Sequence, residues 1–329
     1  MGADRTCEYL GLSLSGPLVA SSSPLTEKVE TALALQEAGV SAIVLPSLFA
    51  EEVEDEEFLV AELMDEGDAF AEFNSSPLPL DGDLGPARHV KQVAEVKAAL
   101  EIPVIASVNA MRPGSWHRYA TMLADAGADA IELNLYSVAA DPRLDSAEME
   151  RIYLEIIESV RESVQVPLAL KLSPYFSSLA GFAPRAKDAG VDGLVLFNRF
   201  YGADLDLEQL AVKPRLALSS PDELRLPLRW VAILSAQLPE LSYATTSGVH
   251  GGADIAKSLL VGANVAYAAS SLLRNGPKHA ATMLAEFYEW LDTNCYESIS
   301  QLRGSMNAAS VPNPSEFERA QYMEVLTAR

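Results

Sequence analysis

EAGVSAIVL, from Glu37 to Leu45, is the first of four stretches that share one design: a helix end, a glycine and a short apolar strand. The others are DAGADAIEL from Asp125, DAGVDGLVL from Asp188 and LVGANVAYA from Leu260. Their glycines stand where a helix C-terminus favours a left-handed residue, at Gly39, Gly127, Gly190 and Gly262. Each stretch therefore predicts the end of a helix and the strand after it.

Four further apolar segments complete a set of eight predicted strands. They are PLVASS from Pro17, PVIASVN from Pro103, PLALKLS from Pro167 and LSYATTSG from Leu241. All eight are nearly continuous apolar runs, which suit parallel strands covered on both faces. Most of their starts lie about 22 to 37 residues apart, which is enough for one strand and one return helix. The pattern predicts an α/β fold, a (β/α)8 TIM barrel.

Two intervals between strands are longer than one helix requires. Residues 49–86 form an acidic insertion that ends in FNSSPLPLDGDLGP, and residues 201–222 form a second insertion. Both follow a strand, so we expect both on the C-terminal face, as lids over a site or as plain surface loops. Residues 277–329 are predicted to be a C-terminal extension that begins with a long helix. Without a Pro-, Gly- or Ser-rich linker, residues 1–329 are expected to form one domain.

Composition restricts the partners and the compartment. Of 329 residues, 49% are apolar, and 24 basic against 46 acidic residues give a net charge of −22. Such a surface repels nucleic acid and anionic lipid, so neither is expected as a partner. No apolar run is long enough to span a membrane, and MGADRTCEYL lacks a signal core. Cys7 and Cys295 are expected to be reduced thiols of a cytoplasmic protein, too few for an iron–sulfur cluster.

Polar residues at the strand ends are the candidates for chemistry. They are Ala20, Ser21 and Ser22 after the first strand, Ser107 and Asn109 in the third, Asn134 and Ser137 in and after the fourth, Lys171 in the fifth, and Asn198 and Arg199 after the sixth. A lysine within the apolar run LALKLSP is costly unless its ammonium meets an anion, a ligand or a barrel carboxylate.

The loop TTSGVHGG, after the seventh strand, predicts a phosphate site. Gly248, Gly251 and Gly252 leave backbone N–H groups free, and a helix is expected to begin near Ala253. His250 is interpreted as a solvated loop residue, with a ligand contact as the alternative. These features suit flavin mononucleotide (FMN), whose phosphate would lie between the last two strands and whose ring would lie above the small residues. The Lys171 ammonium would lie beside the ring, where a cation stabilises the anionic reduced form.

At these residues the chain resembles the dihydroorotate dehydrogenase family of flavin barrels, over about residues 8–290. The similar segments are ASS at Ala20, ELNLYS at Glu132, KLSPYF at Lys171, LFNRF at Leu196, SGVHGG at Ser247 and FNSSPLP at Phe73. The resemblance implies a cofactor, FMN, held by Ala20, Ser21, Ser22, Ser107, Asn134, Lys171, Gly248, Val249, Gly251, Ala269 and Ser270.

The same resemblance implies the oxidation of a CH–CH bond, dihydroorotate to orotate, in pyrimidine biosynthesis. Asn74, Asn134 and Asn198 would hold the substrate, and Ser137 matches the base that takes a proton while hydride passes to the flavin. A serine hydroxyl is a feeble base, so we expect a water relay at Ser137. The alternative is that Ser137 is a loop hydroxyl without a role.

Departures from the family pattern concern the substrate. Pro46 stands where the family has a lysine, Val138 and Ala139 replace a Pro-Asn pair, and Pro77 replaces a glycine. These changes remove polar contacts, so a changed substrate is an alternative expectation. A substrate carboxylate would then depend on another cation, and proximity to the strand ends suggests Arg199 or Arg112.

Other readings stay open. The tail YESISQLRGSMN, from Tyr296, is similar to a segment of dihydropyrimidine dehydrogenases, which suggests a pyrimidine-like ring substrate; the tail is otherwise a packing or homodimer element. Electrons would leave through a soluble acceptor or a partner chain. A Schiff-base lyase using Lys171 is disfavoured because we find no strand-borne carboxylate pattern near it. A flavin-binding barrel without catalysis is the third class.

Overall fold

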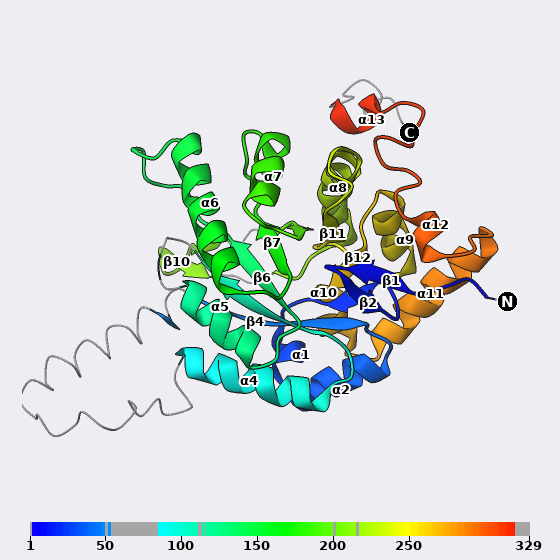
Figure 1. Cartoon of the computed structure of the whole chain (residues 1–329), viewed down its shortest axis with the longest axis horizontal. Coiled ribbons are helices and arrows are strands. Elements are labelled where there is room, and N and C mark those ends of the chain that lie inside the picture. The colour runs from blue at the N-terminus through cyan, green and yellow to red at the C-terminus, as the bar shows by residue number, and fades with distance from the viewer. Residues whose placement is uncertain are drawn as a thin grey trace, which may run out of the picture.

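The computed structural model describes residues 2–49, 52–53, 85–110, 114, 116–199, 202–214 and 217–319. Eight parallel strands close into a barrel in the order β11-β12-β3-β4-β5-β6-β7-β8 (Figure 1). They are β3 (Leu18–Ala20), β4 (Ala42–Leu48), β5 (Val104–Asn109), β6 (Ala130–Leu135), β7 (Leu168–Leu172), β8 (Gly193–Leu196), β11 (Ser242–Thr245) and β12 (Val265–Ala268). The predicted TIM barrel is confirmed, and each of the eight predicted segments supplies one strand.

A helix follows each strand and packs outside it, so both faces of the sheet are covered and β5, β6, β7 and β8 are buried throughout. The outer helices are α2 (Val29–Glu37), α4 (Gly85–Ala99), α5 (Trp116–Asp125), α6 (Ser146–Ser163), α7 (Leu179–Asp188), α8 (Arg225–Gln237), α9 (Gly252–Leu260) and α11 (His279–Thr293). Four helices end at the predicted glycines, whose φ angles lie between +91° and +111°.

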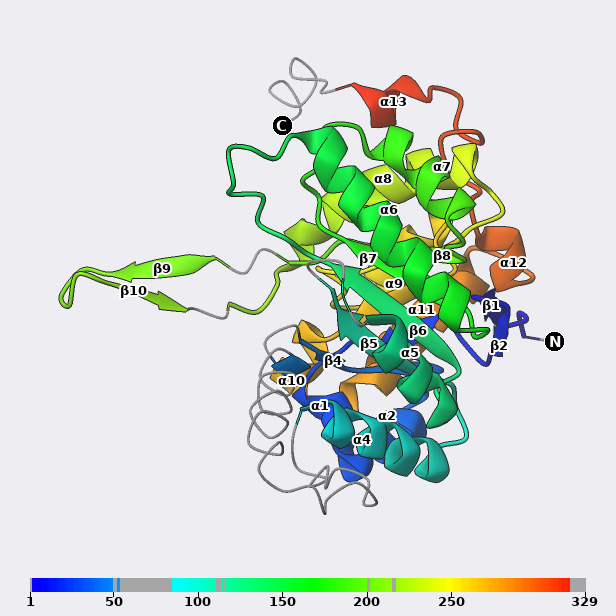
Figure 2. The ribbon, with the colours of Figure 1, turned by 60° about the vertical axis from the view of Figure 1, so that its left-hand side comes forward.

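The insertions and the extension differ in part from expectation. Within the second insertion, β9 (Ala203–Asp206) and β10 (Ala211–Pro214) form an antiparallel hairpin that projects from the body (Figure 2), and a 3-10 helix spans Pro221–Leu224. Insertion 49–86 lies almost entirely outside the described residues. Helix α11, expected in the extension, is instead the eighth outer helix of the barrel.

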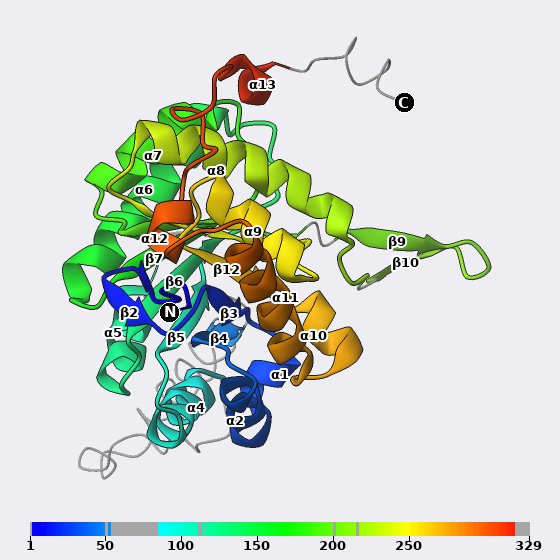
Figure 3. The ribbon, with the colours of Figure 1, turned by 90° about the vertical axis from the view of Figure 1, so that its right-hand side faces the viewer.

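The N-terminal end of the barrel is closed by the chain's own start. A hairpin of β1 (Cys7–Tyr9) and β2 (Leu12–Leu14) lies there, beside α12 (Ile299–Leu302), as Figure 3 shows. Tyr9 is fully buried and its hydroxyl lies 3.0 Å from that of Tyr267 in β12. Cys7 is a buried free thiol and Cys295 an exposed one, so the expectation of unpaired cysteines is confirmed. Burial raises the pKa of Cys7 to about 12.

The first turn of α9 touches α11 so closely that only glycine fits. A Cβ added at Gly252 would lie 2.3 Å from the backbone nitrogen of Phe287. We expect Gly252→Ala to lower the free energy of unfolding by roughly 1–3 kcal/mol, because the two helices must separate. Urea denaturation measures the effect. Gly2→Ala, whose Cβ meets nothing within 4 Å, is the control, and equal stability of the two variants would contradict this packing.

Candidate active site at the C-terminal end of the barrel

The ends of the barrel strands surround a small cavity of about 60 Å³. Most of the predicted cofactor and substrate residues line it: Ser21, Ser22, Lys171, Asn198, Gly248, Val249, Ala269 and Ser270. They come from loops after β3, β8, β11 and β12 and from β7 itself, so residues up to 249 positions apart share one space. The barrel closure, and not local sequence, brings them together.

Lys171 supplies the positive charge of this cavity. Its side chain is 10% exposed, and its Nζ lies 3.1 Å from Oε1 of Glu132, which is fully buried on the neighbouring strand β6. The expectation that no strand-borne carboxylate accompanies Lys171 is therefore wrong. Glu132 is the residue that the sequence analysis missed as part of the site. Its signal was present, since an acidic residue inside the apolar strand AIELNL needs a buried partner.

Neutral polar groups surround the ion pair. The Asn198 Nδ2 donates to Asn134 Oδ1, which joins the ends of β8 and β6, and both side chains are buried. The hydroxyls of Ser107 and Ser47 lie 2.7 Å apart. A register shift in β4 between Val44 and Ser47 brings Ser47 opposite Ser107, so Ser47 and not Pro46 meets the neighbouring strand with its side chain. The roles of Asn134, Asn198 and Ser107 stay predictions.

Backbone donors line the other side of the cavity. The N–H groups of Gly248, Val249 and Ala269 donate to no residue within the described ranges. Gly248 has a φ of +88°, and a Cβ there would lie 2.4 Å from the backbone nitrogen of Leu224. Unsatisfied amides beside a cavity are donors for an anion. The loop thus offers a phosphate-sized group three neutral donors and a glycine that no other residue can replace without strain.

The expectation of free amides at Gly251 and Gly252 is wrong. The Gly251 N–H donates to Asp254 Oδ2 at 3.2 Å, and the Gly252 N–H donates to Glu286 Oε2 at 2.9 Å. Two carboxylates thus satisfy and neutralise the N-terminus of α9. The unpaired amides of this loop are therefore those of Gly248 and Val249, before the helix.

A strap formed by residues 217–220 lies against the cavity. The Ser219 N–H donates to Ser270 Oγ at 2.9 Å, and Ser219 Oγ lies 3.1 Å from His250 Nε2. His250 is therefore half-buried and bonded, where a solvated loop residue was expected. Burial, followed by the charge of Arg274, lowers the pKa of His250. The strap limits the free volume of the cavity in this conformation.

Ser137 lies elsewhere. It lines a second cavity, of about 410 Å³, between the loops after β6 and β7, together with Tyr136, Tyr153 and Tyr175. The structure therefore does not bring Ser137 to the cavity of Lys171. Arg199 does line that cavity, but it lies 3.3 Å from Glu223 and so is already paired. Asn74, Pro77 and Arg112 lie outside the described residues.

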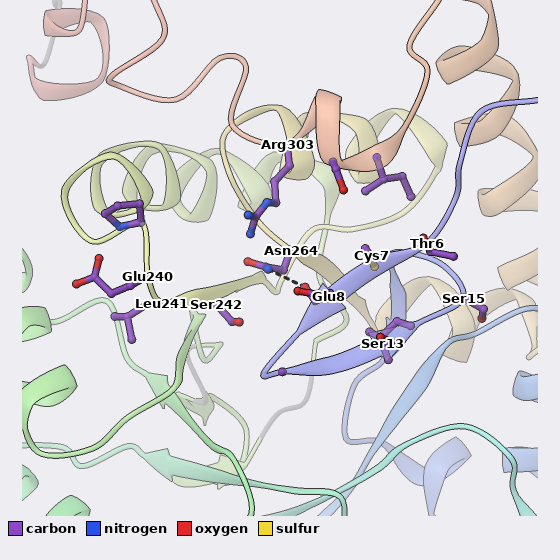
Figure 4. A pocket seen from close by; sticks show the side chains of 15 residues that line it. Thr6, Cys7, Glu8, Ser13, Ser15, Glu240, Leu241, Ser242, Asn264 and Arg303 are labelled. Atoms are coloured by element: carbon purple, nitrogen blue, oxygen red, sulfur yellow. Dashed lines mark hydrogen bonds between the residues drawn. The ribbon is translucent and has the colours of Figure 1, made fainter.

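Another cavity, of about 750 Å³, is at the opposite end of the barrel. Figure 4 shows it between the β1–β2 hairpin and α12, with Arg303, Asn264 and Glu8 around it. It contains none of the predicted site residues. The candidate active site is therefore the smaller cavity, because charge, free amides and buried polar groups meet there. Among the described residues, no helix combines the length and apolar character needed to cross a bilayer.

Comparison with known proteins matches residues 8–291 to the family model described as dihydroorotate dehydrogenase. The chain is 24% identical to the catalytic subunit of dihydroorotate dehydrogenase B (NAD(+)) of Thermoplasma volcanium, over 92% of this chain and 98% of that protein. It is 25% identical to the putative dihydroorotate dehydrogenase A (fumarate) of Aeropyrum pernix, over 67% and 72%. It is 22% identical to the NAD-dependent dihydropyrimidine dehydrogenase subunit PreA of Escherichia coli, over 94% and 78%.

The lowered pKa of His250 makes part of the folding stability depend on pH. The unfolded chain takes up a proton near the ordinary histidine value, about 6.5, whereas the folded protein does so only at lower pH. Stability contributed by neutral His250 is therefore present at higher pH and lost as pH falls through that value. We expect the melting temperature of the wild type to fall more between pH 7.5 and 5.5 than that of His250→Gln. The exposed His117→Gln is the control, and parallel losses in wild type and His250→Gln would contradict the burial effect.

Proposed function

The chain belongs to the dihydroorotate dehydrogenase family, and from this premise we propose that it is an FMN-dependent oxidoreductase acting on a CH–CH bond, in the first instance dihydroorotate to orotate. One observation carries the proposal: the Lys171 ammonium and the free amides of Gly248, Val249 and Ala269 line the same cavity at the active end of the barrel. A cation for an electron-rich ring and donors for a phosphate are what FMN requires.

The residues present fit FMN chemically. The three free amides would hold its phosphate, Ser21 and Ser22 would let the ring approach the backbone, and Lys171 would lie beside the ring. A volume of 60 Å³ matches about two water molecules. The ring is larger than this volume, so the phosphate loop and Lys171 would mark the two ends of a site that extends beyond the cavity.

The chain's own residues would then have separate roles in the reaction. Bound FMN supplies the hydride acceptor. Lys171 places a fixed positive charge where negative charge develops, and it needs no reorganisation because it is already buried. Asn134 and Asn198 offer amide donors and acceptors to the edge of a ring substrate. Ser137 would take the substrate proton and pass it to water, which requires the loop after β6 to move toward the cavity.

A second candidate substrate is an uncharged dihydropyrimidine or another ring with a reducible double bond. Both cations that line the cavity within the described residues are paired, Lys171 with Glu132 and Arg199 with Glu223. Dihydroorotate carries a carboxylate, which a buried site must pair. A neutral ring needs no such partner. Similarity to the dihydropyrimidine dehydrogenase subunit over 94% of the chain supports this candidate. The proposed electron acceptor is soluble, and we propose a cytoplasmic enzyme.

FMN retention tests the phosphate loop. We expect the wild type, mixed with FMN and desalted, to keep a flavin band near about 450 nm. Gly248→Ala should retain FMN at least tenfold more weakly, because the added Cβ meets the backbone of Leu224 at 2.4 Å and displaces the amides. Gly11→Ala is the matched control: its φ of +72° causes the same kind of strain, but its Cβ meets nothing within 4 Å and it lies far from the cavity.

Anaerobic stopped-flow absorbance tests the reaction and the substrate. Mixing the FMN-loaded protein with dihydroorotate or with dihydrouracil should lower the flavin absorbance. The compound that reduces the flavin faster identifies the substrate class. Ser137→Ala is expected to slow bleaching about 10²-fold without weakening FMN binding, which is typical for loss of a proton acceptor. Ser177→Ala, another hydroxyl of the same cavity, should behave as wild type. Unchanged bleaching in Ser137→Ala would remove Ser137 from the mechanism, and absence of bleaching by either compound would contradict the oxidoreductase.

A further inference from the structure

Glu132 is a fully buried acidic residue in the middle of strand β6. Its side chain is fully buried, and only its Oε1 has a partner, the Lys171 Nζ at 3.1 Å. Its Oε2 has no hydrogen-bond partner in the described part of the chain. A buried carboxylate whose second oxygen has no partner among the described residues opposes folding, because no protein hydrogen bond offsets the desolvation of that oxygen. Packing alone therefore does not explain why a glutamate stands here.

The strand register places Glu132 below the lysine. Asn134 in β6 is opposite Lys171 in β7, and Glu132 is opposite Ala169, two residues nearer the N-terminal end. Residues 132 and 134 lie on the same face of β6, since side chains alternate along a strand. The ammonium of Lys171 is thus held between the carboxylate beneath it and the cavity above it.

Two tyrosines are the other titratable groups that face Glu132. Tyr267 of β12 and Tyr9 of β1 are fully buried, and their hydroxyls lie 3.0 Å apart. Burial raises the pKa of both tyrosines, and the charge of Glu132 raises it further. Both are therefore neutral under ordinary conditions. Lys171 is the one cation paired with Glu132 among the described residues.

We propose that Glu132 is the positioning residue of this site: it fixes the Lys171 ammonium at the wall of the cavity and keeps it charged in a water-poor place. Without the carboxylate, a buried amine gives up its proton more readily, because burial then acts alone. The role of the Glu132–Lys171 pair in catalysis rests on the proposed flavin function, since a fixed positive charge stabilises a ligand that becomes negative. The pairing itself can be tested without any flavin.

The test is the pH profile of acetylation of Lys171 by acetic anhydride in FMN-free protein, quantified by peptide mass spectrometry. Only the unprotonated amine reacts. We expect Glu132→Gln to move the midpoint to lower pH by at least one unit, which is about a tenfold faster reaction below both midpoints. Glu132→Asp, which keeps the charge, should restore most of the shift. An unchanged Lys171 profile in Glu132→Gln would overturn the proposal.

Two controls separate positioning from general disruption. Asp129→Asn removes the partner of Lys97, whose Nζ lies 2.7 Å from Oδ2 of Asp129 outside the cavity, so it should change the profile of Lys97 and leave that of Lys171 unaltered. The double variant Glu132→Met/Lys171→Met should melt at or above the wild-type temperature, because apolar side chains of similar size replace a buried ion pair well. A large fall in melting temperature would make the pair structural and overturn positioning.

Added FMN separates this proposal from the proposed function. In the wild type, FMN should protect Lys171 from acetylation. A shifted profile in Glu132→Gln without protection by FMN would support the positioning of Lys171 and contradict the flavin site. If Glu132→Gln fails to fold, Glu132→Met carries the test: it also removes the carboxylate, so its Lys171 profile should move to lower pH, and an unmoved profile would overturn the proposal.

Discussion

A charge inside a closed ring of apolar strands constrains everything around it. The barrel core is built from buried aliphatic and alanine side chains, and Glu132 is fully buried among them. Lys171 and Glu132 can stay charged there only as a pair. Their neighbours are accordingly neutral polar groups, the amides of Asn134 and Asn198, which can meet a charge without adding another. The pair therefore determines what the mouth of the barrel can bind.

The position of the unpaired backbone N–H groups at the cavity follows from which neighbouring N–H groups already have hydrogen-bond acceptors. Asp254 and Glu286 accept hydrogen bonds from the first N–H groups of α9, so these groups at the helix N-terminus are already paired with side chains of the protein. The amides of Gly248, Val249 and Ala269 are left over at the cavity. The Gly251 and Gly252 amides are paired and the Gly248 and Val249 amides are not, so the proposed phosphate position is narrower than the glycines of the loop alone indicate.

The barrel was predictable from sequence because each strand is an apolar run, and seven of the eight follow a glycine with left-handed geometry or begin at a proline. Lys171 and Gly248 could be predicted because they break those runs at the strand ends. Glu132 was missed because polar candidates were sought only at the strand ends, whereas Glu132 lies within the apolar strand AIELNL, two positions before Asn134. The separation of Ser137 from the cavity could not be predicted, since the course of the loop after β6 depends on packing against β7 and α6 and not on local pattern.

The same ion pair distinguishes between the two kinds of chemistry that a barrel lysine can perform. A Schiff base requires an unprotonated amine that can attack a carbonyl carbon. A carboxylate 3.1 Å from Nζ stabilises the protonated form, which has no lone pair for attack. Electrostatic stabilisation of a ring that becomes negative requires the opposite, a permanent cation in a place poor in water. Because Glu132 holds Lys171 in the charged form and two neutral tyrosines lie beneath it, the geometry favours a stabilising cation over a nucleophile, and redox chemistry over carbon–carbon bond cleavage.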